Sequence, residues 1–183
     1  MDRIFFAIPL SDEFTEVMKD AQRRMQDMPG NIKWVQPGKI HLTVKFVGDT
    51  EPKKVEDLYS AVDALNLPAA FDITLTETGI FPNPRRPRVL WVGIERNDAL
   101  TEIAEKINEK LAGFDVDRET RDYHPHLTLG RVKSKGLPGK TVDRFLNMDI
   151  PKKSMNVDSI VCYRSDLKPS GAEYTALHTT KLS

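Results

Sequence analysis

Two short stretches of the chain repeat one residue pattern, His41-Leu42-Thr43-Val44 and His126-Leu127-Thr128-Leu129, 85 positions apart. Side chains of a β-strand alternate between its two faces, so each histidine shares a face with the threonine two residues later. Each stretch therefore predicts a strand that presents an imidazole beside a hydroxyl. The two copies use two of the four histidines in the chain, which makes a chance repeat a poor explanation.

This set of side chains suits acid-base chemistry at a phosphoryl group. An imidazole has a pKa near 6.5 and both donates and accepts protons at neutral pH, so two facing imidazoles can run a displacement without a metal. Thr43 and Thr128 would donate hydrogen bonds to the oxygens of the attacked phosphate. Either threonine alone is explained by its preference for β-strands, but the pairing with histidine favours the phosphate role.

The 85-residue offset extends to the elements that must position the motifs. Apolar runs at 5–10 and 90–94 predict a strand ahead of each motif, and a stretch with helical spacing of its apolar residues follows each run. Ser11 is the expected N-cap of the first helix. Gly30 and Gly113 are expected to end the first and the second helix.

The segments after the motifs also correspond. A helix and then a strand are expected after each motif, with helices near 55–65 and 142–146 and strands at 71–75 and 156–160. The pattern predicts an α+β fold over residues 1–183, a single domain of two pseudo-symmetric lobes. Each lobe would be a mostly antiparallel sheet with helices on its outer face, and the two motifs would meet in a central active-site cleft.

The composition excludes several classes of protein. Of the 183 residues, 39% are hydrophobic and 30% are charged, as in an ordinary globular protein. No apolar stretch approaches the roughly 20 residues of a membrane span, so we expect a cytoplasmic protein without a membrane partner. Cys162 lies in an apolar run and is expected to be a buried, reduced thiol.

The charges of the chain balance. Lys plus Arg and Asp plus Glu number 27 each, so no overall positive field attracts nucleic acid, and any binding of a polyanion must be local. Two basic clusters are candidates for contacts with RNA phosphates outside the reacting one. They are the segment 84–88 and the group Arg131, Lys133, Lys135 and Lys140.

The paired motifs and the residues around them resemble the 2H phosphoesterase superfamily. Within it, the chain is most similar to the RNA 2′,3′-cyclic phosphodiesterase branch, historically called 2′-5′ RNA ligase. The similarity covers nearly the whole chain. The supporting residues are Trp34-Val35, Lys45-Phe46, Pro125, Arg131, the segments 81–84, 89–93 and 165–171, and Tyr174.

The resemblance implies hydrolysis of a terminal RNA 2′,3′-cyclic phosphate to a 2′-phosphate, with RNA ends or nucleoside 2′,3′-cyclic phosphates as substrates. It makes His41 the proton donor and His126 the proton acceptor, with Thr43, Thr128 and Arg131 on the phosphate. It implies no metal and no nucleotide cofactor, and we infer no obligate protein partner. The reverse of 2′-5′ cleavage, in which a ribose 5′-hydroxyl attacks the cyclic phosphate in place of water, would join RNA ends through a 2′-5′ linkage.

Arg131 and the base-stacking residues are the open assignments in this site. Arg131 lies five residues after His126, so a regular strand would put it on the opposite face, and a bulge near Gly130 is needed to redirect it. The alternative is a solvated surface arginine. A terminal base is expected to stack on an aromatic ring, with Phe5 and Tyr123 as candidates.

Two rival interpretations remain. His124, His126 and His41 would supply a three-histidine zinc site, but that site leaves both threonines unexplained. His124 is instead expected to shape the pocket and His178 to be structural. The rival function is a non-catalytic module that binds RNA ends or nucleotides, which is less favoured because arginine or lysine would serve binding alone.

Overall fold

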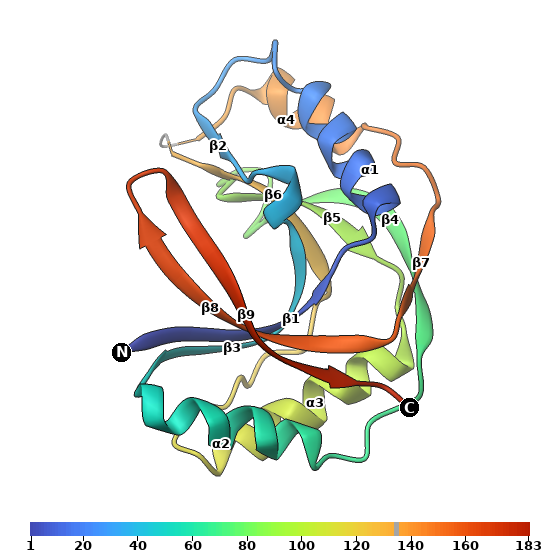
Figure 1. Cartoon of the computed structure of the whole chain (residues 1–183). Helices are drawn as coiled ribbons and strands as arrows, with labels where there is room; N and C mark the ends of the chain where they lie inside the picture. Colours follow the sequence, from blue (N-terminus) through green and yellow to red (C-terminus); the bar gives the residue numbers. More distant parts are fainter. Residues whose placement is uncertain (134–135) are drawn as a thin grey trace.

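The computed structural model describes residues 1–133 and 136–183, and that part contains four α-helices, one 3-10 helix and nine β-strands (Figure 1). In chain order the elements are β1 (Asp2–Pro9), α1 (Asp12–Arg23), β2 (Ile32–Trp34), η1 (Pro37–Lys39), β3 (His41–Thr50), α2 (Pro52–Asp63), β4 (Phe71–Phe81), β5 (Val89–Ile94), α3 (Asp98–Ala112), β6 (His126–Val132), α4 (Gly139–Leu146), β7 (Ser154–Val157), β8 (Ser159–Lys168) and β9 (Gly171–Lys181).

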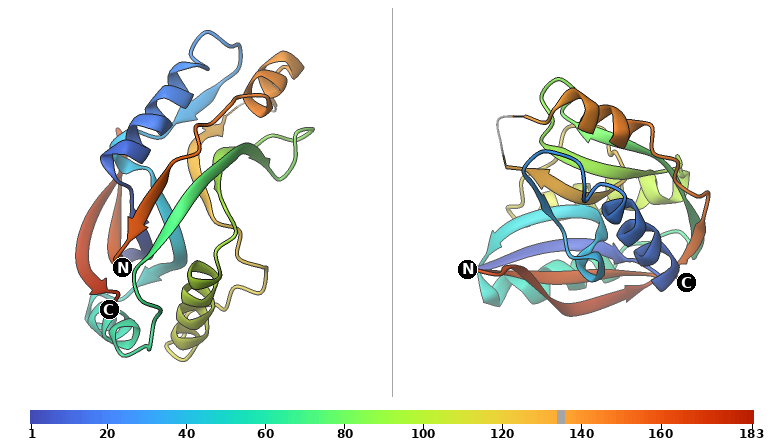
Figure 2. Two further views of the ribbon diagram at one scale, coloured as in Figure 1. Left: turned by 90° about the vertical axis from the view of Figure 1, so that its right-hand side faces the viewer. Right: turned by 90° about the horizontal axis from the view of Figure 1, so that it is seen from above.

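The strands form one curled antiparallel sheet, in the order β7-β4-β5-β6-β3-β1-β8-β9, with β2 paired to β6. In Figure 1 the upper lobe holds β7, β4, β5, β6 and β2 with α1 and α4, and the lower lobe holds β3, β1, β8 and β9 with α2 and α3. The side view in Figure 2 separates the same two helix pairs at opposite ends of the molecule. The expected α+β class with antiparallel strands is confirmed.

The two halves of the chain exchange strands. β4 follows the first motif in sequence but pairs with β5 in the upper lobe, and β8 follows the second motif but pairs with β1 in the lower lobe. The single strand expected over 156–160 is wrong, because Asp158 separates β7, which pairs with β4, from β8. Each lobe is therefore built from both halves of the sequence.

Short polar side chains start the two long helices. The Ser11 hydroxyl accepts a hydrogen bond from the Phe14 amide (3.2 Å), and the Asn97 side chain accepts one from the Leu100 amide (3.0 Å). Gly113 caps α3 as expected. The expectation for Gly30 is wrong, because α1 ends at Arg23 and Gly30 serves the connection to β2, where its φ of +133° suits glycine.

Alternation along β3 and β6 separates the hydrophobic core from the motif side chains. Leu42, Val44, Leu127 and Leu129 are buried in the same core as the apolar faces of the helices. The motif histidines and threonines are half-buried and project from the other face of the sheet.

Two further expectations concern a buried thiol and the membrane. Cys162 is buried in β8, and burial raises the pKa of its thiol to about 12, as expected of an inert cysteine. None of the helices in the described part of the chain is long and apolar enough to cross a membrane.

Candidate active site

The two motif strands meet at the centre of the sheet. β3 and β6 pair through Leu42 and Leu127, the residues that follow the two histidines. Continuing this antiparallel register by one residue on each side sets His41 opposite Thr128 and His126 opposite Thr43. The structure therefore brings the four motif side chains together on one face.

A groove of about 220 Å³ opens over this face. His41, Thr43, Thr128 and Arg131 line it, together with residues of β1 and of the β8–β9 hairpin. His126 stands beside the groove, with its ring edge-on to Phe81 at a centroid distance of 4.9 Å. The structure thus places Arg131 beside the motif residues, as expected.

The two histidines are held in the same way. Nδ1 of His41 lies 2.9 Å from the Lys39 carbonyl oxygen, and Nδ1 of His126 lies 2.7 Å from the His124 carbonyl oxygen. A carbonyl oxygen only accepts hydrogen bonds, so each Nδ1 carries a proton and donates it. Each Nε2 is then left to exchange protons with a bound group.

The surroundings of both imidazoles favour the neutral form. Burial lowers the pKa of His41 and of His126 below the ordinary 6.5, and the charge of Arg131 lowers both further. The hydrogen bonds to the Lys39 and His124 carbonyls act in the opposite direction. Arg131 therefore lies close enough to act on both histidines.

A β-bulge directs Arg131 to the groove. In the pairing of β5 with β6, Trp91 lies opposite Thr128 and Leu90 opposite Gly130, so Leu129 has no partner. The extra residue shifts the alternation by one position and returns Arg131 to the face of His126 and Thr128. The bulge that the sequence required is present, one residue before Gly130.

The first motif has the same bulge. In the pairing of β1 with β3, Ala7 lies opposite Thr43 and Phe6 opposite Lys45, so Val44 is the extra residue. This shift brings Phe46 to the groove, at the position that Arg131 occupies in the second motif. Phe46 is 51% exposed, with Arg3 over its ring (5.2 Å) and Phe5 beside it (6.0 Å).

A buried glutamine ties one bulge to the other half of the chain. Nε2 of Gln22, on α1, donates to the Leu129 carbonyl (2.9 Å) and to the Val35 carbonyl (2.7 Å). Leu129 is the bulged residue of the second motif, and Val35 belongs to the segment that leads into His41. Gln22 therefore fixes the bulge that aims Arg131.

Asn108, on α3, makes a second link between distant parts of the chain. Its Oδ1 accepts from Nζ of Lys45 (2.7 Å), which follows the first bulge, and from the Glu119 amide (2.9 Å). Lys45 also donates to the Asp117 carbonyl (2.6 Å). These hydrogen bonds tie the loop that leads to His126 to the strand of His41. The sequence did not predict this link, because nothing near Lys45 identifies its distant partners.

Neither predicted stacking residue presents a free ring. Phe5 is 2% exposed and packs beneath His41 (centroids 4.9 Å) and beside Phe46 (6.0 Å), so it supports the groove floor. Tyr123 donates its hydroxyl to the Thr43 carbonyl (2.8 Å) and holds the first motif strand. Sequence reasoning missed Phe46, although its spacing from His41 equals that of Arg131 from His126.

The remaining histidines have separate places. His124 packs edge-on to Trp91 (5.2 Å), beside His126. His178 stacks on Tyr59 (4.3 Å) and contacts Asp63 through Nε2 (2.7 Å), which ties β9 to α2 as a structural histidine would. Within residues 1–133 and 136–183, no three His, Cys, Asp or Glu side chains are arranged to hold a metal, so the zinc alternative has no geometric support. Of the basic clusters, Lys135 lies outside the described residues.

A family model described as LigT-like phosphoesterase matches the chain twice, over residues 8–91 and 92–174. An RNA 2′,3′-cyclic phosphodiesterase of Methanothermobacter thermautotrophicus is 31% identical, over 98% of each chain. The enzyme of that name from Methanocaldococcus jannaschii is 34% identical, over 96% of this chain and 98% of the relative.

Solved structures show the same fold. A crystal structure of a Thermus thermophilus protein superimposes with a TM-score of 0.82 at 27% identity, covering 98% of this chain and 97% of that one. The crystal structure of Escherichia coli LigT complexed with 3′-AMP superimposes with a TM-score of 0.80 at 25% identity, covering 100% of this chain and 98% of that one. Each of the two matched ranges of this chain contains one of the two histidine motifs.

Proposed function

Because the chain belongs to the LigT-like phosphoesterase family and is a relative of RNA 2′,3′-cyclic phosphodiesterases, we propose that it opens terminal RNA 2′,3′-cyclic phosphates to 2′-phosphates. His41 and His126 act as acid and base, Thr43, Thr128 and Arg131 bind the phosphate, and no metal or cofactor takes part. The matching histidine geometry, with both Nδ1 atoms engaged by carbonyls, is the observation that carries this proposal.

The reaction is a single displacement at phosphorus. Nε2 of neutral His126 takes a proton from water as the water oxygen attacks phosphorus. The bond from phosphorus to the 3′ oxygen breaks, and Nε2 of protonated His41 gives that oxygen its proton. The threonine hydroxyls and Arg131 stabilise the charge on the non-bridging oxygens. Attack by a ribose 5′-hydroxyl in place of water, with the same two proton transfers, would form a 2′-5′ linkage and release the 3′-hydroxyl.

The groove also suits a nucleotide. Escherichia coli LigT has been crystallised in complexes with 3′-AMP, with NADP⁺ and with ATP. In this chain, Phe46 offers an exposed ring at the groove that bears the phosphate-binding side chains. A terminal base held against Phe46 would leave its phosphate among the motif residues.

We expect the protein to convert adenosine 2′,3′-cyclic phosphate to the 2′-phosphate at an unchanged rate after prolonged chelation, since its side chains supply both proton transfers. Turnover followed by ³¹P NMR identifies the product and its isomer. Formation of the 3′-phosphate would contradict the assigned leaving oxygen. Loss of activity on chelation, restored by zinc, would contradict the metal-free mechanism, and stoichiometric binding without turnover would favour the non-catalytic module.

The pH dependence of kcat/KM is expected to be bell-shaped, with its maximum below the ordinary imidazole value of 6.5. Burial and Arg131 lower the pKa of both histidines, so both limbs of the profile should lie in the acidic range. An anionic phosphate favours protonated imidazoles, so the kcat profile should lie at higher pH. Initial rates at constant ionic strength give both profiles. A kcat/KM maximum in the alkaline range would contradict this electrostatic description.

A further inference from the structure

Exposed cations gather on the upper-lobe side of the groove, which we call the upper bank and define by Lys33, Arg131 and Lys133. Lys33 pairs with Arg131 across β2 and β6, so both face the groove, and Lys133 follows two residues after Arg131. None of these three side chains takes part in an ion pair between described residues.

Most cations on the opposite side already have partners. This lower bank consists of β1, β3 and the β8–β9 hairpin. Arg164 pairs with Asp166 (3.2 Å), and Lys168 pairs with Glu173. Nζ of Lys39 donates to a backbone carbonyl of β9 (2.9 Å). Arg3, also on this side, lies over the Phe46 ring at 5.2 Å.

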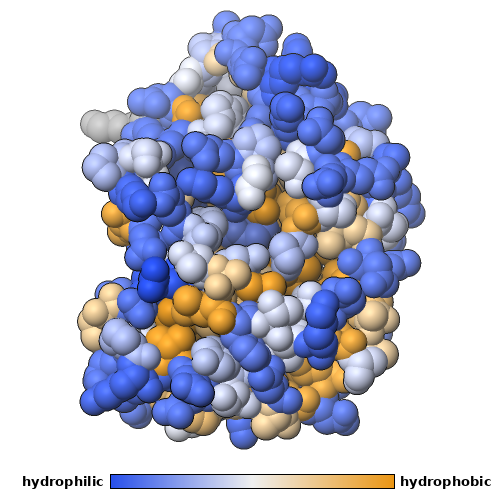
Figure 3. Space-filling view, viewed as in Figure 1, coloured by the Kyte–Doolittle hydropathy of each residue, from blue (hydrophilic) through white to orange (hydrophobic). Residues whose placement is uncertain are grey.

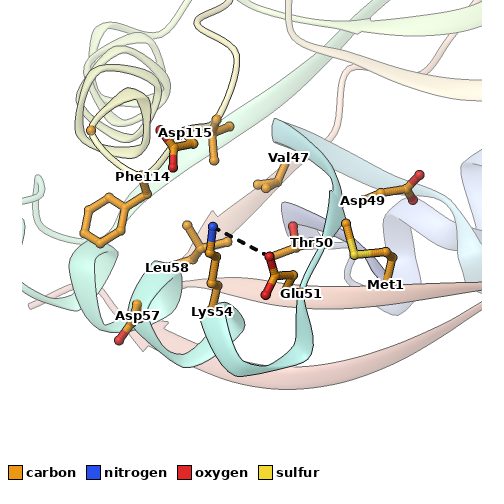
Figure 4. Close-up of a pocket in the computed structure, with 12 residues that line it drawn as sticks. Met1, Val47, Asp49, Thr50, Glu51, Lys54, Asp57, Leu58, Phe114 and Asp115 are labelled. Atoms are coloured by element: carbon orange, nitrogen blue, oxygen red, sulfur yellow. Dashed lines mark ion pairs between the residues drawn. The ribbon is translucent and has the colours of Figure 1, made fainter.

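Beyond the lower bank the surface is acidic. A pocket of about 320 Å³ between the start of β1, the end of β3, α2 and the end of α3 contains Asp49, Glu51, Asp57 and Asp115 (Figure 4). Among the described residues that line it, Lys54 has the one cationic side chain, and it lies 3.9 Å from the Glu51 carboxylate. A polyanion is repelled from this end of the molecule.

The two ends of the molecule also differ in the polarity of their surfaces. In the space-filling view, hydrophilic residues dominate the upper part of the molecule, and hydrophobic residues come to the surface below (Figure 3). In a chain of zero net charge, the cations of the upper bank give the groove one basic side along which phosphates can pass.

We propose that the RNA strand that precedes the terminal nucleotide lies along the upper bank, with its phosphates bound by Lys33 and Lys133. This inference rests on the proposed function of the groove. It specifies the substrate as a single-stranded oligoribonucleotide and names the side of the groove along which that strand runs. Alternate residues of a β-strand are about 6.6 Å apart, a spacing that allows them to contact successive phosphates of an extended RNA strand. Contacts of this kind bind the backbone and leave the sequence unread.

The hairpin between β4 and β5 extends the same bank. Arg85 and Arg86 are exposed at its turn, and both of their amides donate to the Asn83 side chain (3.0 Å each). The turn is thus ordered by its own hydrogen bonds, while its arginine side chains remain outside any ion pair of the described residues. A longer RNA would meet these two residues after Lys133.

The test compares two substrates that share one reacting group, adenosine 2′,3′-cyclic phosphate and a short single-stranded oligoribonucleotide with the same terminus. In the variant Lys33→Gln/Lys133→Gln, we expect kcat/KM for the oligonucleotide to fall roughly tenfold, with the mononucleotide almost unaffected. The slope of log kcat/KM against log salt for the oligonucleotide should weaken by about 1.4, because each lost phosphate contact removes about 0.7. The control variant Lys53→Gln/Lys110→Gln has the same change in charge outside the groove and should retain both rates.

The outcomes separate this inference from the proposed function. Equal rates of the bank variant and the unmodified protein on the oligonucleotide would overturn the inference, while turnover of the mononucleotide would still support the function. If the unmodified protein hydrolyses neither substrate, the proposed function fails. Anisotropy titrations with a fluorescent oligonucleotide ending in a 2′-phosphate then decide the inference alone, since unchanged affinity of the bank variant would overturn it and a loss restricted to that variant would support it.

Discussion

Replacing His126 or His41 with alanine is expected to lower turnover of a 2′,3′-cyclic phosphate by roughly 10²–10⁴-fold, because each change removes one of the two proton transfers in a single step. Both side chains are half-buried at the groove and neither belongs to the core, so the fold should persist. The double variant should lose far less than the product of the single losses. Steady-state kinetics and circular dichroism of the three proteins test this.

The two single variants should also differ in pH dependence. His126→Ala removes the base and should abolish the acidic limb of the profile, and His41→Ala removes the acid and should abolish the alkaline limb. His178→Ala is the matched control, because its ring contacts Tyr59 and Asp63, away from the groove. Near-normal turnover in a folded His126→Ala protein would rule out the mechanism.

Replacing Thr43 or Thr128 with valine is expected to cost about 10–10³-fold in turnover. Valine keeps the β-branched shape that suits the strand but removes the hydroxyl donor to the phosphate. The lower end of this range reflects the charge that phosphate already carries before reaction, so part of the loss should be weaker binding of a 2′-nucleotide product. Kinetics and calorimetric titration with adenosine 2′-phosphate measure the two parts.

Thr74→Val provides the control for these changes. The Thr74 hydroxyl lies 2.8 Å from the Ser154 hydroxyl, where β4 pairs with β7 at one end of the sheet. The same chemical change at this position should leave turnover intact. If both groove variants kept full turnover and product affinity, the threonines would be ordinary strand formers. The assignment would then rest on the histidines alone.

The motif strands and the main helices were predictable because each follows a period that local sequence expresses. His41 and Thr43 share a face by simple alternation, and Ser11 marks the start of α1. The place of Arg131 at the site was predictable only on the condition that a bulge precedes it. A bulge adds one residue to a strand, and strand periodicity alone does not show where that residue is. The adjacent buried residues Leu129 and Gly130 are the trace of that bulge.

The features that escaped prediction depend on contacts between distant parts of the chain. Phe5 has an aromatic side chain of the kind that stacks on a base, but the rings of His41 and Phe46 cover it. Phe46 reaches the groove through a bulge that the pattern of the first motif did not require. The hydrogen bonds of Gln22 to Leu129 and of Lys45 to Asn108 join residues 107 and 63 positions apart. No local periodicity encodes such pairs.

The exchange of β4 and β8 between the lobes has a consequence for the origin of the site. A half-chain alone would leave its last strand without the neighbour that it has here, whereas two identical half-chains related by a two-fold axis would supply that neighbour to each other. Their axis would pass through the Leu42 and Leu127 pair, and the catalytic centre would lie on a dimer interface. Joining the two copies in one polypeptide would free them to differ, and equivalent positions here hold an aromatic ring in Phe46 and a cation in Arg131. Such broken symmetry gives a substrate with chemically different ends only one way to bind.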